Sequence, residues 1–255
     1  MSDDNLSASD KRIILHIDQT VHRPTHWWTP AVHELLKYLE ACEFPYSPRV
    51  LGFDEEGREV LSFIEGESGA DGWAKITTDD GLMKFAQLLR AYHEAVRDFV
   101  PTPSSQWAYS VEPLKPGEIL CHGDFGPWNI VWRGDEPVGI LDWDMVLPAP
   151  PRFDVLYALE YAAPFRDDET ALSWHHFPSV PDRKHRIEVF ANAYGLEHRG
   201  DLVRDVASVQ RRVGTFVARL AERGLQPQAD WVADGALEEV EQRARWTEAH
   251  REWFL

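Results

Sequence analysis

The chain has 255 residues, a formal net charge of −17 and only two cysteines, Cys42 and Cys121. Its length allows one large domain or two small lobes with a buried core. The negative charge disfavours binding to nucleic acids and to anionic membranes, and no stretch reaches the roughly 20 apolar residues of a membrane span. The first residues lack the apolar segment of a secretory signal. Because so few cysteines do not suggest a disulfide framework, the sequence predicts a cytoplasmic protein.

The first 66 residues predict a small, strand-rich unit with one helix. We expect strands at 11–17, 20–23, 49–53 and 59–64, with turns at Asp18-Gln19 and at 54–57. Thr29 followed by Pro30 is typical of a helix start, in which the hydroxyl caps the first turn. Apolar residues then recur at helical spacing to about Cys42, which predicts an amphipathic helix.

The rest of the chain predicts mostly helices, with a few strands in its middle. Residues 66–72 hold three glycines and are expected to form a linker. A long helix is expected from Thr78 to about Phe99, followed by a proline-rich surface loop. We expect short strands at 118–121, 129–132 and 138–141, and further helices at 152–163, 182–195, 200–223 and 229–250.

The segment from Cys121 to Asp144 carries the clearest chemical pattern. Asp124 follows an apolar strand, Asn129 opens the next strand, and a turn at Gly134 reverses the chain so that the third strand ends at Asp142. One hairpin would thus gather two carboxylates and an amide at the same edge. Phosphoryl transfer needs a carboxylate near the attacking hydroxyl and oxygen ligands for Mg²⁺. The spacing therefore predicts a phosphoryl-transfer site.

The run H-G-D-x-x-x-x-N from His122 to Asn129, followed by I-L-D-W-D, resembles the catalytic core of the aminoglycoside phosphotransferase family, which is related to the protein kinases. The resemblance implies Asp124 as catalytic base, assisted by Asn129, and it implies Asn129 and Asp142 as Mg²⁺ ligands. Asp144 matches the second acid of the family's D-x-D and would support the metal site. His122 would brace the catalytic loop.

The same resemblance implies an α+β fold of the bilobal, protein-kinase-like type. Its small, shortened, strand-rich N-lobe would span residues 1–66 and bind the nucleotide. The larger, mainly helical C-lobe would span residues 67–255 and carry the catalytic and acceptor-binding groups.

The nucleotide side is expected to rest on three residues. Arg23 would contact the nucleotide phosphates, where the family has a basic residue on an N-lobe strand. Glu34 on the following helix would hold Arg23, although His33 lies in a similar position. Glu65 follows the last N-lobe strand, where the family's hinge binds the base through backbone groups. The chain departs from the family pattern because Gly52 is its first glycine, so no glycine-rich loop precedes Arg23, and residues 7–9 would be a poor substitute.

After Asp144 the chain has no long activation segment, which favours a small-molecule kinase over a protein kinase. The leading hypothesis is a Mg²⁺-dependent transfer of the γ-phosphoryl group of ATP or GTP to a hydroxyl of a small polar or cationic acceptor. Acids at 167–169, 230, 238 and 239 are candidates for contacting it, or are ordinary solvated acids, and residues 174–177 are a candidate lid. Two alternatives stay open: a weak or inactive kinase-like protein that confers immunity by binding a toxin or antibiotic, and a choline- or homoserine-kinase-like metabolic enzyme.

Overall fold

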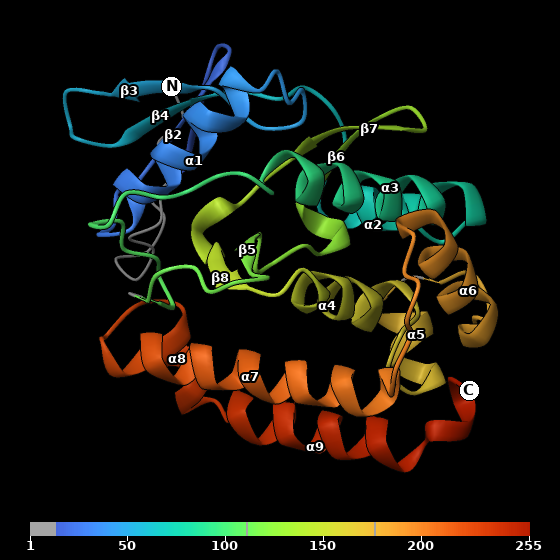
Figure 1. Cartoon of the computed structure of the whole chain (residues 1–255). Helices are drawn as coiled ribbons and strands as arrows, with labels where there is room; N and C mark the ends of the chain where they lie inside the picture. Colours follow the sequence, from blue (N-terminus) through green and yellow to red (C-terminus); the bar gives the residue numbers. More distant parts are fainter. Residues whose placement is uncertain (1–13, 111, 176) are drawn as a thin grey trace, which may run out of the picture.

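A computed structural model describes residues 14–110, 112–175 and 177–255 (Figure 1). The first strand-rich part contains a four-stranded antiparallel sheet in the order β1-β2-β4-β3. Its strands are β1 Leu15–Ile17, β2 Thr20–Arg23, β3 Val50–Phe53 and β4 Glu59–Ser62. The expected turn between β1 and β2 forms, with Asp18 at a positive φ of 51°. The expected strand residues 11–13 and the segment 7–9 lie outside the described residues.

Helix α1, Thr29–Ala41, buries the apolar stripe that its spacing predicts, including Val32, Leu35 and Leu39. Thr29 is its first helical residue and not its cap, because the hydroxyl of Thr29 accepts a hydrogen bond from the amide of His26 outside the helix (2.9 Å). The helix therefore begins where the sequence predicts, but Thr29 is its first residue and Trp28 takes the cap position.

The segment that connects the two parts is attached by backbone hydrogen bonds to strand β6, Ile130–Arg133, of the second part. Glu67 and Trp132 exchange two backbone hydrogen bonds of 2.8 Å, and an added Cβ at Gly66, whose φ is 153°, would lie 2.4 Å from the carbonyl oxygen of Trp132. A residue without a side chain is required here because the two backbones approach so closely. The expected linker is shorter than residues 66–72, since it leads directly into helix α2, Ala70–Lys75.

The larger part is mainly helical and carries two small strand pairs (Figure 1). Strand β5, Ile119–Cys121, pairs with β8, Leu147–Ala149, and β6, Ile130–Arg133, pairs with β7, Glu136–Ile140. Short 3-10 turns, η1 Pro127–Asn129 and η2 Trp143–Met145, follow the first and third of the expected strands. Strand β8 was not predicted, because its LPA sequence has a proline and no alternation.

The helices of this part are α3 Asp79–Ala95, α4 Arg152–Ala162, α5 Asp168–Ser173, α6 Arg183–Tyr194, α7 Leu202–Glu222, α8 Gln228–Ala233 and α9 Ala236–Ala249, with a final turn η3 Arg251–Trp253. The helix expected from Thr78 begins at Asp79, and Thr78 caps it by accepting from the amide of Gly81. The single helix expected at 229–250 is two, because the chain breaks at Gly235, whose φ is 95°. The short helices α2 and α5 were not predicted.

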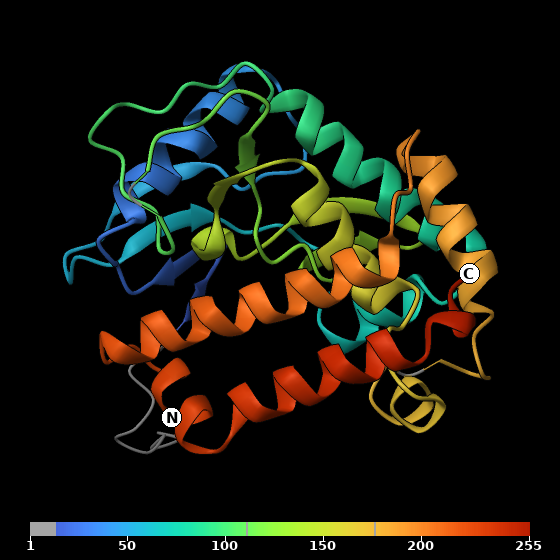
Figure 2. The same ribbon diagram turned by 60° about the horizontal axis from the view of Figure 1, so that its bottom comes forward.

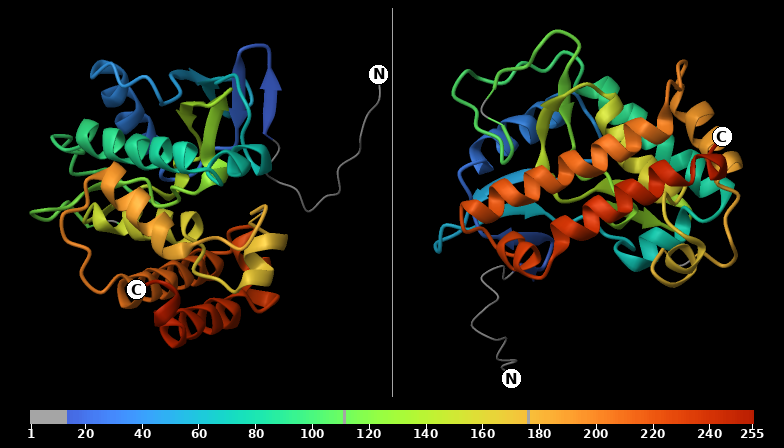
Figure 3. Two further views of the ribbon diagram at one scale, coloured as in Figure 1. Left: turned by 90° about the vertical axis from the view of Figure 1, so that its right-hand side faces the viewer. Right: turned by 90° about the horizontal axis from the view of Figure 1, so that it is seen from below.

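The two parts stack, with the sheet and α1 above and the helices below (Figure 3). Helices α7 and α9 run side by side along the lower face (Figure 2). One hydrophobic core runs through both parts and includes Trp28 from the first and Tyr92 and Trp143 from the second. No helix among the described residues is long and apolar enough to cross a membrane.

Candidate phosphoryl-transfer site

The loop between β5 and β6 positions Asp124 and Asn129 against each other. The amide nitrogen Nδ2 of Asn129 donates to Oδ2 of Asp124 (2.8 Å) and to its backbone carbonyl (2.9 Å). Pro127 begins the 3-10 turn η1 that carries Asn129 back toward Asp124. The side chain of Asn129 is buried, so this pair is a fixed part of the loop.

Asp142 is delivered to the same place by the β6–β7 hairpin. The amide of Leu141 donates to the carbonyl of Asn129 (2.7 Å), so Asp142 follows directly on the residue that faces Asn129. Asp142 has a left-handed backbone, with φ 56°, and its side chain is 45% exposed. The sequence-based expectation that the hairpin brings residues 124, 129 and 142 together thus agrees with the hydrogen bonds, and the charge of Asp142 acts on Asp124.

Asp124 has an unusual environment for a carboxylate. Burial, and then the charge of Asp142, raise the pKa of Asp124 to about 7, against the hydrogen bonds from Tyr157 and Asn129, which lower it. The hydroxyl of Tyr157, on α4, donates to Oδ1 of Asp124. Tyr157 was not among the predicted site residues. A carboxylate whose pKa lies near neutrality is suited to accept a proton during a reaction.

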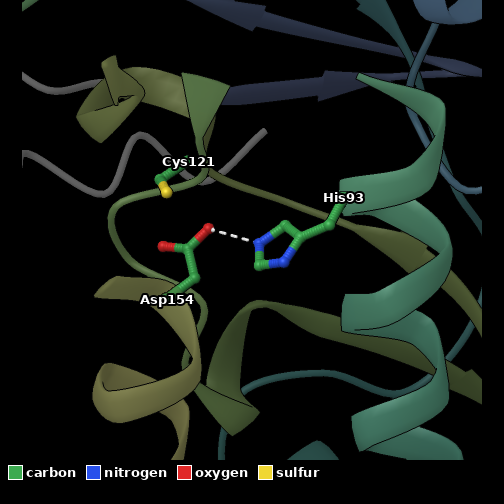
Figure 4. Close-up of side chains that lie close together, drawn as sticks. All are labelled: His93, Cys121 and Asp154. Atoms are coloured by element: carbon green, nitrogen blue, oxygen red, sulfur yellow. Dashed lines mark hydrogen bonds and ion pairs between the residues drawn. The ribbon is translucent and has the colours of Figure 1, made fainter. Parts of the chain in front are cut away.

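His93, Cys121 and Asp154 form a buried cluster next to the loop (Figure 4), and Asp154 holds the loop main chain in place. Asp154, on α4, accepts from the amides of His122 (2.6 Å) and Gly123 (2.9 Å) and lies 3.1 Å from Nε2 of His93. Cys121 lies beside them, and its side chain, together with those of His93 and Asp154, could in principle surround a metal ion. Because both oxygens of Asp154 already accept hydrogen bonds, we interpret the cluster as a brace of the loop.

His122 is also held by two hydrogen bonds. Its Nε2 donates to the carbonyl of Leu141 (3.0 Å), and its Nδ1 accepts from the amide of Asp124 (3.3 Å). Burial lowers the pKa of His122 to about 4. A neutral ring with both nitrogens hydrogen-bonded agrees with the expected bracing role.

A cleft of about 400 Å³ lies between the sheet and this hairpin. Its apolar wall comes from β2, β4 and the β6–β7 hairpin, with Val21, Leu61, Ile64, Val131 and Leu141 among the lining residues. Its polar end holds Arg23, Asn129, Asp142 and Asp144. The cleft therefore joins an apolar space to an end that carries charged and polar side chains.

Arg23 stands at the centre of the charged end. Its Nε lies 3.0 Å from Glu59, its Nη2 lies 2.6 Å from Asp144, and its Nη1 lies 3.9 Å from Asp142. Burial by itself would lower the pKa of Arg23, but the carboxylates of Asp144, Asp142 and Glu59 raise it. The guanidinium thus connects the sheet to the hairpin of the helical part.

The expected pair between Arg23 and Glu34 does not form. Glu34 instead accepts from the amide of Thr102 (3.0 Å) and from the hydroxyl of Ser105 (2.7 Å), so it fastens the loop after α3. Glu59 takes the position beside Arg23, because Arg23 and Glu59 face each other across β2 and β4. The α1 side chain that reaches this network is His33, which lies 2.8 Å from the other oxygen of Glu59.

Asp144 and Glu65 occupy places that differ from those of Asn129 and Asp142. Asp144 is buried, and its Oδ1 accepts from Arg23 and from the indole of Trp28 (3.1 Å). Glu65 is exposed, and its carbonyl accepts from Arg133 (3.2 Å). Gly66, one residue further, lines the cleft.

A second hollow, of about 710 Å³, lies among α5, α7, α8 and α9. Two of the predicted acceptor acids line it, Asp167 and Glu239, together with Trp174, Trp231 and Trp246. Asp167 also caps α5, and Asp168 pairs with Arg183 (2.9 Å). His175 is fully buried against Trp73 and is therefore part of the packing, while His176 lies outside the described residues.

The strand-rich part, the helical part and the hairpin with its braced loop define a protein-kinase-like phosphotransferase fold. The chain belongs to the phosphotransferase enzyme family (APH), whose profile matches residues 106–199. It is 36% identical to the trifolitoxin immunity protein of Rhizobium leguminosarum bv. trifolii over 199 residues. These aligned residues cover 76% of this chain and 74% of that protein.

Solved structures share the fold at low sequence identity. A choline/ethanolamine kinase family protein from Mesorhizobium loti is 16% identical with a TM-score of 0.58, covering 95% of this chain and 86% of that one. The GDP complex of aminoglycoside 2′-phosphotransferase-IIIa is 16% identical with a TM-score of 0.56, covering 94% and 91%. Amicoumacin kinase in complex with AMP-PNP, Ca²⁺ and Ami is 11% identical with a TM-score of 0.58, covering 94% and 88%.

Proposed function

We propose that this protein transfers the γ-phosphoryl group of a nucleoside triphosphate, ATP or GTP, to a hydroxyl of a small molecule. The observation that carries the proposal is the hydrogen-bonded pair of Asp124 and Asn129, followed across the hairpin by Asp142. Asn129 and Asp142 line the charged end of a cleft that also holds Arg23. Nucleotide complexes of two structures with this fold, with GDP and with AMP-PNP, support the choice of co-substrate. In this proposal residues 1–66 bind the nucleotide, and residues 67–255 carry catalysis and the acceptor.

The residues present fit a Mg²⁺ ion. Asn129 uses Nδ2 to bond Asp124, so its amide oxygen points to the opposite side, and the carboxylate of Asp142 is exposed to the cleft. Amide and carboxylate oxygens are ligands that Mg²⁺ prefers, and the bound ion would neutralise the charge of the nucleotide phosphates. We assign Asp144 to holding Arg23, because its Oδ1 already accepts two hydrogen bonds.

Each of the side chains around the site then has its own role in the proposed reaction. Asp124 orients the acceptor hydroxyl and takes its proton as the oxygen–phosphorus bond forms. Arg23 offers its guanidinium to the phosphates, and Glu59 keeps the guanidinium at the cleft. The braces by Asp154 and His122 fix the loop, so that the rate gain comes from position and charge.

Calorimetric titration of Mg²⁺-ATP and Mg²⁺-GTP tests the proposal. We expect one nucleotide to bind the wild type, binding to weaken at least tenfold in Asp142→Asn, and Asp124→Asn to keep binding while losing transfer to an acceptor such as choline or gentamicin. Asp135→Asn, at the exposed turn of the same hairpin, is the matched control. Absence of binding of either nucleotide to the wild type would refute the enzymatic proposal.

The second candidate is a kinase-like protein that gives immunity by binding a toxin without phosphorylating it. Two observations favour it: the resemblance to the trifolitoxin immunity protein, and the occupation of Asp124 by Tyr157 and of Asp144 by Arg23. The two candidates differ in their need for nucleotide. A thermal shift with Mg²⁺-nucleotide supports the enzyme, whereas a shift with a toxin that needs no nucleotide and survives Asp124→Asn supports sequestration.

A further inference from the structure

Both oxygens of the Asp124 carboxylate are occupied by donors from the protein itself. Asn129 Nδ2 donates to Oδ2 (2.8 Å), and the hydroxyl of Tyr157 donates to Oδ1. In the proposed reaction the acceptor must present a hydroxyl to this carboxylate. Tyr157 therefore already makes, within the chain, the contact that the acceptor has to make.

The tyrosine is held firmly in this position. It lies on α4, one turn after Asp154, whose carboxylate binds the amides of His122 and Gly123 in the catalytic loop. The residue is 6% exposed, and its ring packs near Tyr161, with ring centres 5.3 Å apart, and near Trp128, at 6.5 Å. Helix and loop thus behave as one unit, and the hydroxyl cannot drift away from Asp124 without moving a packed ring.

Water is the competitor that any phosphotransferase of this kind must exclude. If a water molecule donated to Asp124, it could attack the γ-phosphorus, its proton would pass to the carboxylate, the bond to the β–γ bridging oxygen would break, and the products would be the nucleoside diphosphate and inorganic phosphate. An acceptor hydroxyl follows the same steps and yields a phosphate ester. The two outcomes differ only in which hydroxyl reaches Asp124.

We propose that Tyr157 is a specificity-determining residue that occupies the proton-accepting oxygen of Asp124 and keeps water from it until an acceptor hydroxyl takes its place. This inference rests on the proposed phosphotransferase function. It gives the aromatic side chain a role in the reaction although its own oxygen takes no phosphate. It also requires that an acceptor bind tightly enough to exchange one buried hydrogen bond for another.

The test measures release of inorganic phosphate from the full-length protein with Mg²⁺-ATP or Mg²⁺-GTP and no added acceptor. Tyr157→Phe removes only the hydroxyl. We expect its phosphate release to rise by roughly tenfold or more over the wild type, since a general base contributes about 10²- to 10⁴-fold once water can reach it. The nucleotide dissociation constant should stay unchanged, because Tyr157 does not line the nucleotide cleft.

Two controls separate this role from a structural one. Tyr161→Phe alters the next turn of α4 within the same aromatic cluster and should leave phosphate release at the wild-type rate. The double variant of Tyr157→Phe with Asp124→Asn should lose the gain, because the gain passes through Asp124. Tyr157→Met, which also lacks the hydroxyl, repeats the test if the phenylalanine variant does not fold.

The outcomes are distinguishable. If the hydroxyl-free variants bind nucleotide like the wild type but release phosphate no faster, the inference about Tyr157 is wrong and the proposed function stands. If the wild type binds neither nucleotide, the proposed function fails and the inference fails with it. A gain that persists without Asp124 would also overturn the role assigned to Tyr157.

Discussion

The two sides of the cleft are held in different ways. The loop from His122 to Asn129 is braced from within the helical part, where Asp154 binds two main-chain amides and His93 from positions that are fully or almost fully buried. The opposite side includes a cation, Arg23, which reaches from the sheet to carboxylates of both parts. The first arrangement keeps its partners whatever enters the cleft, whereas the second has to share its cation with an arriving phosphate. Substitutions at the Asp154 brace should therefore affect mainly stability, and substitutions at Arg23 should affect mainly ligand binding.

The largest effect is expected from breaking the brace. Asp154→Ala leaves two buried amides and His93 without their acceptor, so the free energy of unfolding should fall by about 3–5 kcal/mol. Urea unfolding of the variant and of Asp234→Ala, an exposed acid of the helical part, measures the difference. A loss below about 1 kcal/mol would show that the cluster does not hold the loop.

The contribution of Asp124 to stability should depend on pH. Its pKa in the folded protein, about 7, lies above the usual value of about 3.9 for an unfolded chain. The unfolded chain then releases this proton first, so stability falls as pH rises from about 4 to about 7 and changes no further above it. Between pH 5 and pH 8 the wild type should lose about 2–3 kcal/mol more than Asp124→Asn, as measured by urea unfolding at both pH values. Parallel curves for the two proteins would contradict the raised pKa.

Changing the cation should affect ligand binding more than folding. Arg23→Lys keeps the charge but cannot span Glu59 and Asp144 with one planar group. We expect the affinity for Mg²⁺-nucleotide to fall about tenfold, which is about 1.4 kcal/mol, with a smaller loss of stability. Arg58→Lys, in the turn between β3 and β4, is the control, and calorimetry gives both affinities. An unchanged affinity would remove Arg23 from the nucleotide site.

The smallest effect is expected at the residue that sequence analysis placed beside Arg23. Glu34→Gln should change nucleotide affinity less than twofold and stability by less than about 1 kcal/mol, because Glu34 binds an exposed loop. Glu59→Gln should weaken nucleotide binding clearly more, since Glu59 is buried beside Arg23. Calorimetric titration of both variants decides the assignment, and a larger effect at Glu34 would reverse it.

Local patterns explain what could be predicted from the sequence. The spacing of Asp124, Asn129 and Asp142 lies within one hairpin, so a short range of chain determines their relative positions. The protein-kinase-like fold followed from the same motif and from the order of strands and helices. The predicted helix boundaries were wrong where a helix is short, as at α2 and α5, and where a helix is interrupted, as at Gly235. Such short helical segments give little periodicity in the sequence.

Contacts between distant segments explain what could not be predicted. Glu59 meets Arg23 only through the pairing of β2 with β4, and the antiparallel register that sets them opposite each other is not visible in either strand alone. Tyr157 is 33 residues from Asp124, and nothing in its helix distinguishes it from a core tyrosine. Only the packing of α4 against the loop places the hydroxyl of Tyr157 beside the carboxylate.

The pinned connection at Gly66 has a mechanical consequence. Because Glu67 is tied to Trp132 by two backbone hydrogen bonds and the carbonyl of Trp132 leaves no room for a Cβ at residue 66, the chain cannot slide over strand β6. The tie therefore sets the distance between the chain at Gly66 and strand β6 on this side of the cleft. The Arg23 side is joined by side-chain ion pairs instead, so it should yield more readily than the Gly66 side when a ligand enters the cleft.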